Sequence, residues 1–194
     1  MMRRIHSDNR GAALVEFALV LPIVLLLILG GLEIGHTFYV RSILIGKLQK
    51  AARDISLEDA GADTRVAAIK TEVERAVHQV MIGAAVDWDI RSFHDYKNAA
   101  HRPEEFGDAN SDGNCNNGET FVDSNGNGRW DADGSKIGRG GAKDVLMMTA
   151  SVSYPRLGLG KFFTAAPTVN LSATTLLRNQ PSSTQSQPTT GTCP

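Results

Sequence analysis

The chain opens with a nearly unbroken apolar run, whereas the rest of the sequence mixes apolar and polar positions. Sixteen uncharged residues separate Glu16 from Glu33, and as a helix they would cover about 24 Å at about 1.5 Å per residue. The hydrocarbon core of a bilayer is about 30 Å thick, so the two carboxylates would lie near its edges. Pro22 is tolerated where neighbouring groups satisfy the freed backbone. The pattern predicts a transmembrane helix over residues 12–38.

The helical period continues beyond the apolar run. Apolar residues still recur every three or four positions, but lysines and arginines now occupy the opposite side. We therefore expect one long helix over residues 12–57, half in the membrane and half beyond it, which ends at Gly61. Asp63 or Thr64 can cap a second helix. Its apolar stripe is typical of core packing and consists of Val66, Ile69, Val73, Val77 and Val80.

Two later segments have the alternation of half-buried strands. Residues 145–154 and 168–177 alternate apolar with small or hydroxyl side chains, and residues 86–93 form an earlier candidate strand. Pro155 and the glycines that follow it, Gly158 and Gly160, mark the connection between the last two strands. The predicted fold class is α+β: a long N-terminal helix, a second helix and a small antiparallel sheet of about three strands. After Pro181 the chain is rich in Ser, Thr, Gln and Pro, so we expect a disordered tail over residues 181–194.

Residues 107–134 are rich in Asp, Asn and Gly and contain a calcium-type spacing. Acidic and amide residues occupy alternate positions from Asp108, Gly113 follows at the sixth position, and Glu119 stands at the twelfth. Ca²⁺ takes about six to eight oxygen ligands, which this spacing supplies from side chains, a backbone carbonyl and a closing bidentate carboxylate. The candidate ligands are Asp108, Asn110, Asp112, Asn114, Asn116 and Glu119.

A second copy of the pattern begins at Asp123 but has Gly134 in place of the closing glutamate. Asp131 or Asp133 would then have to complete the shell, and with one fewer assured carboxylate we expect weaker binding. Too few residues separate the two loops for helices to flank each one, which excludes paired EF-hands. The candidate ligands are Asp123, Asn125, Asn127, Asp131 and Asp133. The alternative is a solvated Asn/Gly-rich loop that binds no metal.

The chain has two cysteines, Cys115 and Cys193, and neither belongs to a CxxC pair. In an exported protein they can form a disulfide that closes a long loop. The alternative is two free thiols, because sequence does not show whether the two sulfur atoms meet.

Charge and motif content exclude several function classes. The formal net charge of −1 argues against a nucleic-acid protein, which would show a basic face. The sequence has no phosphate-binding glycine loop, no nucleophile elbow and no HExxH motif. We therefore expect neither an enzyme nor a protein with a small-molecule substrate.

The junction between the basic leader and the apolar run carries a processing-type pattern. Gly11 closes the leader MMRRIHSDNRG, and Glu16 follows five residues later within an apolar helix. This spacing resembles the processing site of type IV pilin-like proteins. The stretch RGAALVEFALVLPIVLLLILGGLEIG is similar to the start of TadE/TadG-like proteins, the pseudopilins of the tight-adherence (type IVc-like) pilus system. The ending LSATTLLRNQP resembles the C-terminal half of TadE-like domains, whereas Phe17 stands where tyrosine is common in fimbrial members.

The resemblance implies that a prepilin peptidase cuts on the cytoplasmic side after Gly11. The mature chain would begin at Ala12, with Glu16 at its fifth position. An ionisable side chain near hydrocarbon is costly and is usually retained for a partner. The new ammonium group of Ala12, on the same chain or on a neighbour, would be that partner. The alternative is that Glu16 reaches the cytoplasmic headgroups.

The flanking charges and the outer end of the run bear on orientation. Arg3, Arg4 and Arg10 precede the run and favour a cytoplasmic N-terminus. A conventional signal peptide needs a small-x-small cleavage site, which the outer end lacks in good context. We predict a leader over residues 1–11, a membrane helix over residues 12–38 and a periplasmic domain over residues 39–180.

The predicted function is that of a pseudopilin or minor pilin in the bacterial inner membrane, in a tight-adherence pilus or at its base. The partners implied are the inner membrane, the prepilin peptidase, and other pilin and pseudopilin subunits, with Ca²⁺ as the cofactor. The alternative is a permanently anchored, calcium-binding interaction module facing the periplasm or the cell surface.

Overall fold

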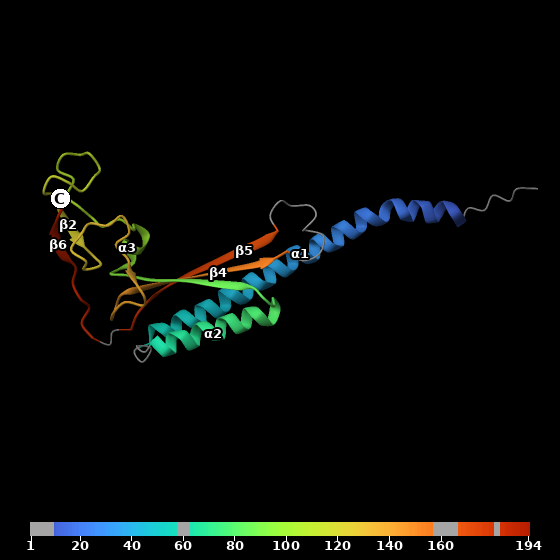
Figure 1. Ribbon diagram of the computed structural model, residues 1–194, viewed down its shortest axis with the longest axis horizontal. Coiled ribbons are helices and arrows are strands. Elements are labelled where there is room, and N and C mark those ends of the chain that lie inside the picture. The colour runs from blue at the N-terminus through green and yellow to red at the C-terminus, as the bar shows by residue number, and fades with distance from the viewer. Residues whose placement is uncertain (1–9, 58–62, 157–166, 181–182) are drawn as a thin grey trace, which may run out of the picture.

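A computed structural model describes residues 10–57, 63–156, 167–180 and 183–194. Helix α1 (Arg10–Ser56) runs without interruption through Pro22, and its N-terminal half projects far beyond the rest of the molecule (Figure 1). The predicted helix over residues 12–57 is therefore confirmed. The expected end at Gly61 and the loop glycines Gly158 and Gly160 lie outside the described residues.

The two halves of α1 have different surroundings. Its most apolar stretch is long enough to cross a membrane, and none of that stretch is buried within the molecule. From Val40 onward, one face of the helix is buried, at Leu44, Leu48, Ala52 and Ile55 among others. The N-terminal half is apolar on all sides and exposed, so it needs a nonpolar environment outside the chain. The distal half instead buries its apolar face against other parts of the same chain.

Helix α2 (Asp63–Val80) packs against the distal half of α1. The middle of the predicted stripe is buried at Ile69, Val73 and Val77, while Val66 and Val80 are partly buried at its ends. On the exposed side, Lys50 Nζ lies 3.1 Å from Glu72 Oε1. The stripe is ordinary core packing, as its spacing indicates.

The main sheet has four antiparallel strands in the order β3-β1-β4-β5. The long strands are β1 (Ala85–Phe93), β4 (Val145–Pro155) and β5 (Thr168–Arg178), each within one residue of its predicted bounds. The fourth strand, β3 (Lys136–Ile137), has only two residues and pairs with β1. A two-residue strand has no period of its own, so the sequence could not reveal it.

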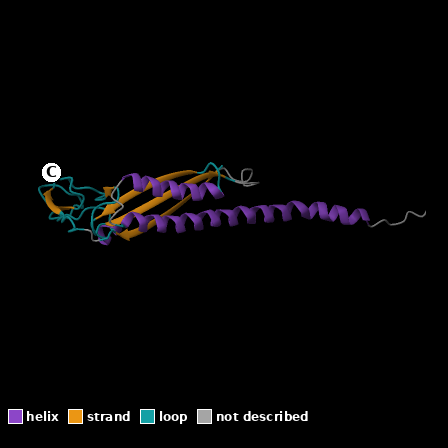
Figure 2. Cartoon of the chain, turned by 90° about the horizontal axis from the view of Figure 1, so that it is seen from below, coloured by secondary structure: helices purple, strands orange, loops and turns teal. Residues whose placement is uncertain are grey.

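Both helices cover one face of this sheet (Figure 2). Alternate residues of β4 point toward them, and α1 contacts β4 and β5. The core between the layers includes Leu146, Met148, Ala150, Val152 and Tyr154. The opposite face is polar along most of its length, as at Thr149, whose hydroxyl hydrogen-bonds to that of Thr174 at 2.9 Å.

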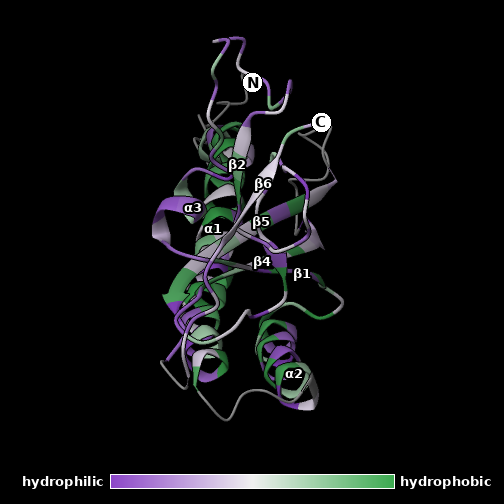
Figure 3. Cartoon of the chain, turned by 90° about the vertical axis from the view of Figure 1, so that its left-hand side faces the viewer, coloured by the Kyte–Doolittle hydropathy of each residue, from purple (hydrophilic) through white to green (hydrophobic). Residues whose placement is uncertain are grey.

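A second, two-stranded sheet lies at the end of the molecule farthest from the projecting helix (Figure 1). It pairs β2 (Thr120–Asp123) with β6 (Thr189–Thr192), and the short helix α3 (Tyr96–Ala100) lies nearby. Figure 3 looks onto this end, where the loops are coloured largely hydrophilic. We call this part of the molecule, residues 94–144 and 183–194, the head.

The prediction of a disordered C-terminal tail was wrong for residues 183–194. Strand β6 aligns Gly191 with Phe121 of β2, and a Cβ atom at Gly191 would overlap the Phe121 ring. Cys193 donates its backbone N–H to the carbonyl of Glu119 at 2.7 Å. The composition of this segment correctly indicated few hydrophobic residues. The segment is nevertheless ordered, because β6 pairs with β2 and Cys193 is bonded to Cys115.

Candidate functional site

The membrane-proximal candidate residues lie at the start of α1. Gly11, Ala12, Glu16 and Phe17 are all exposed, and Phe17 is 63% exposed. Ala12 and Glu16 are four residues apart, so they lie on one face of the helix, one turn from each other. The geometry is that of an open helix end whose acidic side chain is accessible to a neighbouring group.

The other acidic residue of the apolar segment, Glu33, has a partner that sequence reasoning missed. Its Oε1 lies 3.1 Å from Nη1 of Arg156, which follows β4. One turn farther along, Thr37 Oγ1 accepts a hydrogen bond from the Tyr154 hydroxyl at 3.4 Å. Arg156 is far from Glu33 in the sequence and lies outside α1. The pattern of residues around either position therefore could not predict this contact. The contacts attach the end of the sheet to α1 at the outer edge of the predicted span.

The first Asp/Asn/Gly motif folds into a loop held by its own side chains. Asp108 accepts hydrogen bonds from the backbone N–H of Asp112 (3.1 Å) and of Gly113 (3.0 Å). Gly113 has a φ of 76°, a left-handed conformation that explains glycine at the sixth position. The Nδ2 atoms of Asn110 and Asn116 lie 2.7 and 2.8 Å from Asp112 Oδ2. Hydrogen bonds from Asn116 above all lower the pKa of the Asp112 carboxyl group.

Glu119 closes this loop from its twelfth position. Its Oε1 accepts backbone N–H bonds from Ala109 (2.7 Å) and Asn110 (3.4 Å), and its Oε2 accepts one from Asn116 (3.3 Å). The side chain is buried. Hydrogen bonds within the loop thus involve all the candidate residues of the first motif: Asp108, Asn110, Asp112, Asn114, Asn116 and Glu119.

The second motif repeats the same backbone path. Asp123 accepts from the backbone N–H of Asn127 (3.1 Å) and of Gly128 (2.8 Å), and Gly128 has a φ of 79°. The Nδ2 atoms of Asn125 and Asn127 lie 2.9 and 2.5 Å from Asp131 Oδ2. Four of the five candidate residues of the second motif therefore converge.

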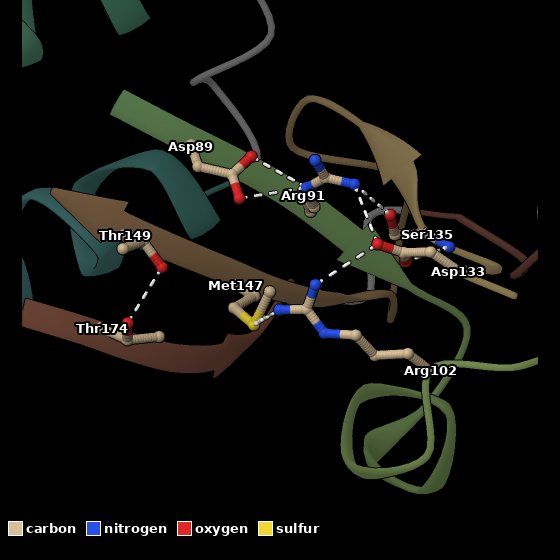
Figure 4. A network of polar contacts seen from close by, with 8 residues as sticks. All are labelled: Asp89, Arg91, Arg102, Asp133, Ser135, Met147, Thr149 and Thr174. Atoms are coloured by element: carbon tan, nitrogen blue, oxygen red, sulfur yellow. Dashed lines mark hydrogen bonds and ion pairs between the residues drawn. The ribbon is translucent and has the colours of Figure 1, made fainter. Parts of the chain in front are cut away.

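The fifth, Asp133, points away from this loop. Its Oδ2 lies 3.0 Å from Arg91 Nη1 and 3.3 Å from Arg102 Nη1, and Arg91 also hydrogen-bonds to Ser135 (Figure 4). Burial raises the pKa of Asp133, but hydrogen bonds from Ser135 and the two arginine charges outweigh it, so the pKa lies below its ordinary value. The expectation that Asp133 could complete the second motif is corrected: its charge is already engaged with two guanidinium groups.

Replacing Asp133 by asparagine is expected to lower the free energy of unfolding by about 1 kcal/mol, because partly exposed ion pairs contribute about that much at most. Since folding lowers the pKa of Asp133, its contribution is complete above its unfolded value and is lost as the pH falls through the folded value. Urea unfolding of the full chain should show the difference at neutral pH and a smaller one near pH 3. The control is Asp87→Asn, an exposed carboxylate of β1. Equal destabilisation by both variants would contradict the prediction.

A buried carboxylate that the motif did not include lies against the second loop. Glu104 is 2% exposed, and it accepts backbone N–H bonds from Ser124, Asn125 and Asp131. Burial raises the pKa of Glu104; these backbone hydrogen bonds oppose the shift, and the charge of Asp123 adds to it. Sequence reasoning missed Glu104, because it precedes both motifs and only the fold places it here.

Apart from Asp133, the candidate donors of both loops are carboxylate and asparagine side chains in equal numbers, and their oxygens suit a hard cation. In the described part of the chain, no group of three or more His, Cys, Asp or Glu side chains converges as a metal site. The remaining donors are asparagine side chains and backbone carbonyls, which Ca²⁺ accepts as ligands. A half-turn of an asparagine amide exchanges its nitrogen and oxygen, so the inward-facing Nδ2 positions can equally present oxygen. The donor chemistry therefore fits Ca²⁺.

Cys115 and Cys193 form a disulfide, with their Cα atoms 5.3 Å apart. Cys115 belongs to the first loop and Cys193 follows β6. The bond joins segments separated by 78 residues in the sequence. It therefore links the first loop covalently to the C-terminal strand.

The fold defines an α+β protein whose projecting apolar helix is suited to membrane anchoring. Residues 11–54 match the family model described as TadE-like protein, so this chain carries a TadE-like domain in α1. The match supports a minor pilin associated with the tight-adherence pilus. The match does not extend to the C-terminal strands. The resemblance of LSATTLLRNQP to TadE-like domains therefore stays a prediction. No curated protein and no solved structure matches the chain.

Proposed function

We propose that this chain is a membrane-anchored minor pilin that a prepilin peptidase processes after Gly11 and that takes part in assembly of a tight-adherence pilus. The observation that carries the proposal is the TadE-like match, which begins at Gly11 and covers the apolar helix. Its role is structural, through packing of helices with other pilin subunits, and not catalytic.

The exposed face of α1 supports this proposal. Ala12 and Glu16 lie one turn apart on one face, so the ammonium group formed by cleavage and the carboxylate are placed to pair within one chain or between neighbours. Such a pair would offset the cost of placing a charge near hydrocarbon. Glu33 already has a partner in Arg156, whereas Glu16 forms no ion pair with the residues that the structure describes and is exposed to another subunit.

The disulfide supports a head outside the cytoplasm. Disulfides persist in oxidising compartments such as the bacterial periplasm and are rare in the reducing cytosol. Cys115 and Cys193 both belong to the head. A cytoplasmic leader and a periplasmic head on opposite sides of the membrane agree with the arginines that precede the apolar run.

Intact-mass analysis of the full-length protein, extracted from native membranes, tests the proposal. The expected N-terminus is Ala12, because the peptidase removes residues 1–11. A Gly11→Val variant serves as the control and should keep its leader. An intact leader on the unmodified chain would contradict processing and would favour the permanently anchored module. A chain that lacks the apolar run would contradict both.

We also propose that the two loops of the head bind Ca²⁺. The donor set and the left-handed glycines Gly113 and Gly128 support this proposal. Isothermal titration of the oxidised, detergent-solubilised full chain with CaCl₂ is expected to show binding at or below about 10⁻³ M, the range of extracellular calcium modules. Substituting Asp108→Ala together with Asp112→Ala should remove the first site. The absence of binding heat at millimolar calcium would contradict the proposal.

A further inference from the structure

Glu104 lies outside both calcium-type motifs, yet the fold brings its carboxylate into the second loop. Its Oε1 accepts hydrogen bonds from the backbone N–H of Ser124 (2.7 Å) and Asn125 (3.3 Å). Its Oε2 accepts one from Asp131 (3.1 Å). These donors are the second, third and ninth residues of a loop that begins at Asp123.

The closing glutamate of the first loop makes the same set of contacts. Glu119 accepts from Ala109 and Asn110 with one oxygen and from Asn116 with the other. These are the second, third and ninth residues of a loop that begins at Asp108. Glu104 therefore occupies, relative to the second loop, the place that Glu119 occupies in the first.

The residue at the twelfth position of the second loop leaves room for this side chain. A Cβ atom at Gly134 would lie 2.6 Å from Glu104 Cγ, closer than such atoms approach. The backbone on both sides of Glu104 is held in register: Glu104 N–H bonds to the Asp131 carbonyl (3.0 Å), and Gly134 N–H bonds to the Arg102 carbonyl (2.9 Å). The Glu104 side chain therefore fills the space that a glutamate at position 134 would occupy.

The two buried carboxylates at this position accept hydrogen bonds but have no cationic side chain beside them among the described residues. Glu104 is 2% exposed and Asp123 is 3% exposed, and neither forms an ion pair within the described residues. Buried carboxylates are costly unless they are paired or coordinate a metal. Backbone N–H groups stabilise Glu104 in part but carry no net positive charge. A divalent cation in the loop would provide that charge.

We propose that Glu104 is the closing calcium ligand of the second loop, in place of the absent glutamate at Gly134. The inference rests on the proposed binding of Ca²⁺ by the head. With Glu104 included, each loop has three carboxylates: Asp108, Asp112 and Glu119 in the first, and Asp123, Asp131 and Glu104 in the second. Both loops then have the same number of candidate carboxylate ligands, so we expect the two sites to bind calcium with similar affinity.

The test is isothermal titration of the oxidised, detergent-solubilised full chain with CaCl₂. The unmodified chain is expected to bind two ions, and Glu104→Gln is expected to bind one. Glu105→Gln is the matched control, since Glu105 is adjacent in sequence but exposed and paired with Lys97; it should still bind two ions. Trp130, whose indole N–H bonds to the Glu104 carbonyl at 2.9 Å, reports on the second loop by its fluorescence.

Double substitutions separate a ligand from a residue needed only for folding. Glu104→Gln combined with Asp123→Ala should still bind one ion, because both changes affect the same site. Glu104→Gln combined with Asp112→Ala should bind none. The inference is overturned if Glu104→Gln keeps two sites with affinities within threefold of the unmodified chain. It is also overturned if that single change abolishes both sites, which would mark Glu104 as a folding residue. If the unmodified chain binds no calcium, the proposed function fails first.

Discussion

Removing the Cys115–Cys193 disulfide is expected to reduce the stability of the β2–β6 sheet by about 3 kcal/mol, the chain-entropy value for a loop of about 15 residues. The two cysteines are 78 residues apart in sequence, but β4 and β5 stay folded between them when β6 detaches, so only the segment after Arg178 gains freedom. Strand β6 has only four residues, so without the bond its pairing depends on a few backbone hydrogen bonds and the contact of Gly191 with Phe121. We expect β6 to detach from β2 for a much larger fraction of the time.

Amide hydrogen exchange of the full chain measures this change. Protection of Thr189–Thr192 should fall about a hundredfold in Cys115→Ser/Cys193→Ser, at about 1.4 kcal/mol per factor of ten. Reduction of the unmodified chain should produce the same loss. Amides of β4 and β5, which pair along eleven residues in a different sheet, serve as the internal control and should keep their protection. Unchanged exchange in β6 would show that backbone pairing alone holds the strand.

Leu48→Ala is expected to lower the free energy of unfolding by about 2–5 kcal/mol, the range for buried leucines whose removal leaves a cavity. Leu48 is 1% exposed and belongs to the core between α1, α2 and the main sheet. The other members of that core come mainly from α1, α2 and the main sheet, so a shortened side chain at this position leaves a cavity among packed elements. Urea unfolding of the detergent-solubilised full chain, followed by Trp88 fluorescence, measures the loss.

Trp88 is a suitable reporter for that experiment because it joins two of the packed elements. Its indole N–H donates to Glu74 Oε1 of α2 at 2.9 Å, while the residue itself belongs to β1. The matched control is Ile82→Ala, since Ile82 is 90% exposed; exposed substitutions usually change stability by less than about 0.5 kcal/mol. Equal losses for the two variants would mean that the distal half of α1 does not depend on its contacts with the sheet.

Much of the fold could be predicted from local patterns. The bounds of α1 and the three long strands agree with their predicted bounds within two residues, and α2 contains the apolar stripe predicted for a second helix. In each case the signal is the spacing of apolar residues along the segment. Residues that share a buried face recur about every 3.6 positions in a helix and about every 2 positions in a strand. The candidate residues of the first calcium-type motif also lie in one hydrogen-bonded loop, because a tight loop depends on residue types at fixed short spacing.

Contacts between distant segments could not be predicted in this way. The pairing of β6 with β2, the ion pair of Glu33 with Arg156 and the insertion of Glu104 into the second loop all join residues with no common period. The composition of residues 183–194 indicated disorder, since it contains little to bury. Their order arises because Cys193 is bonded to Cys115 and because β2 offers an open edge.

The sequence by itself determined the apolar helix, its processing-type start, the α+β order of elements and the spacing of the oxygen donors, because each depends on neighbours within a few turns or one strand. Only the tertiary structure decided which carboxylates face which partners. Asp133 pairs with Arg91 because the head packs against β1, and Glu104 enters the second loop because its backbone bonds to Asp131 within the head. Side-chain surroundings of this kind depend on chain-distant contacts, which no local pattern of residues records.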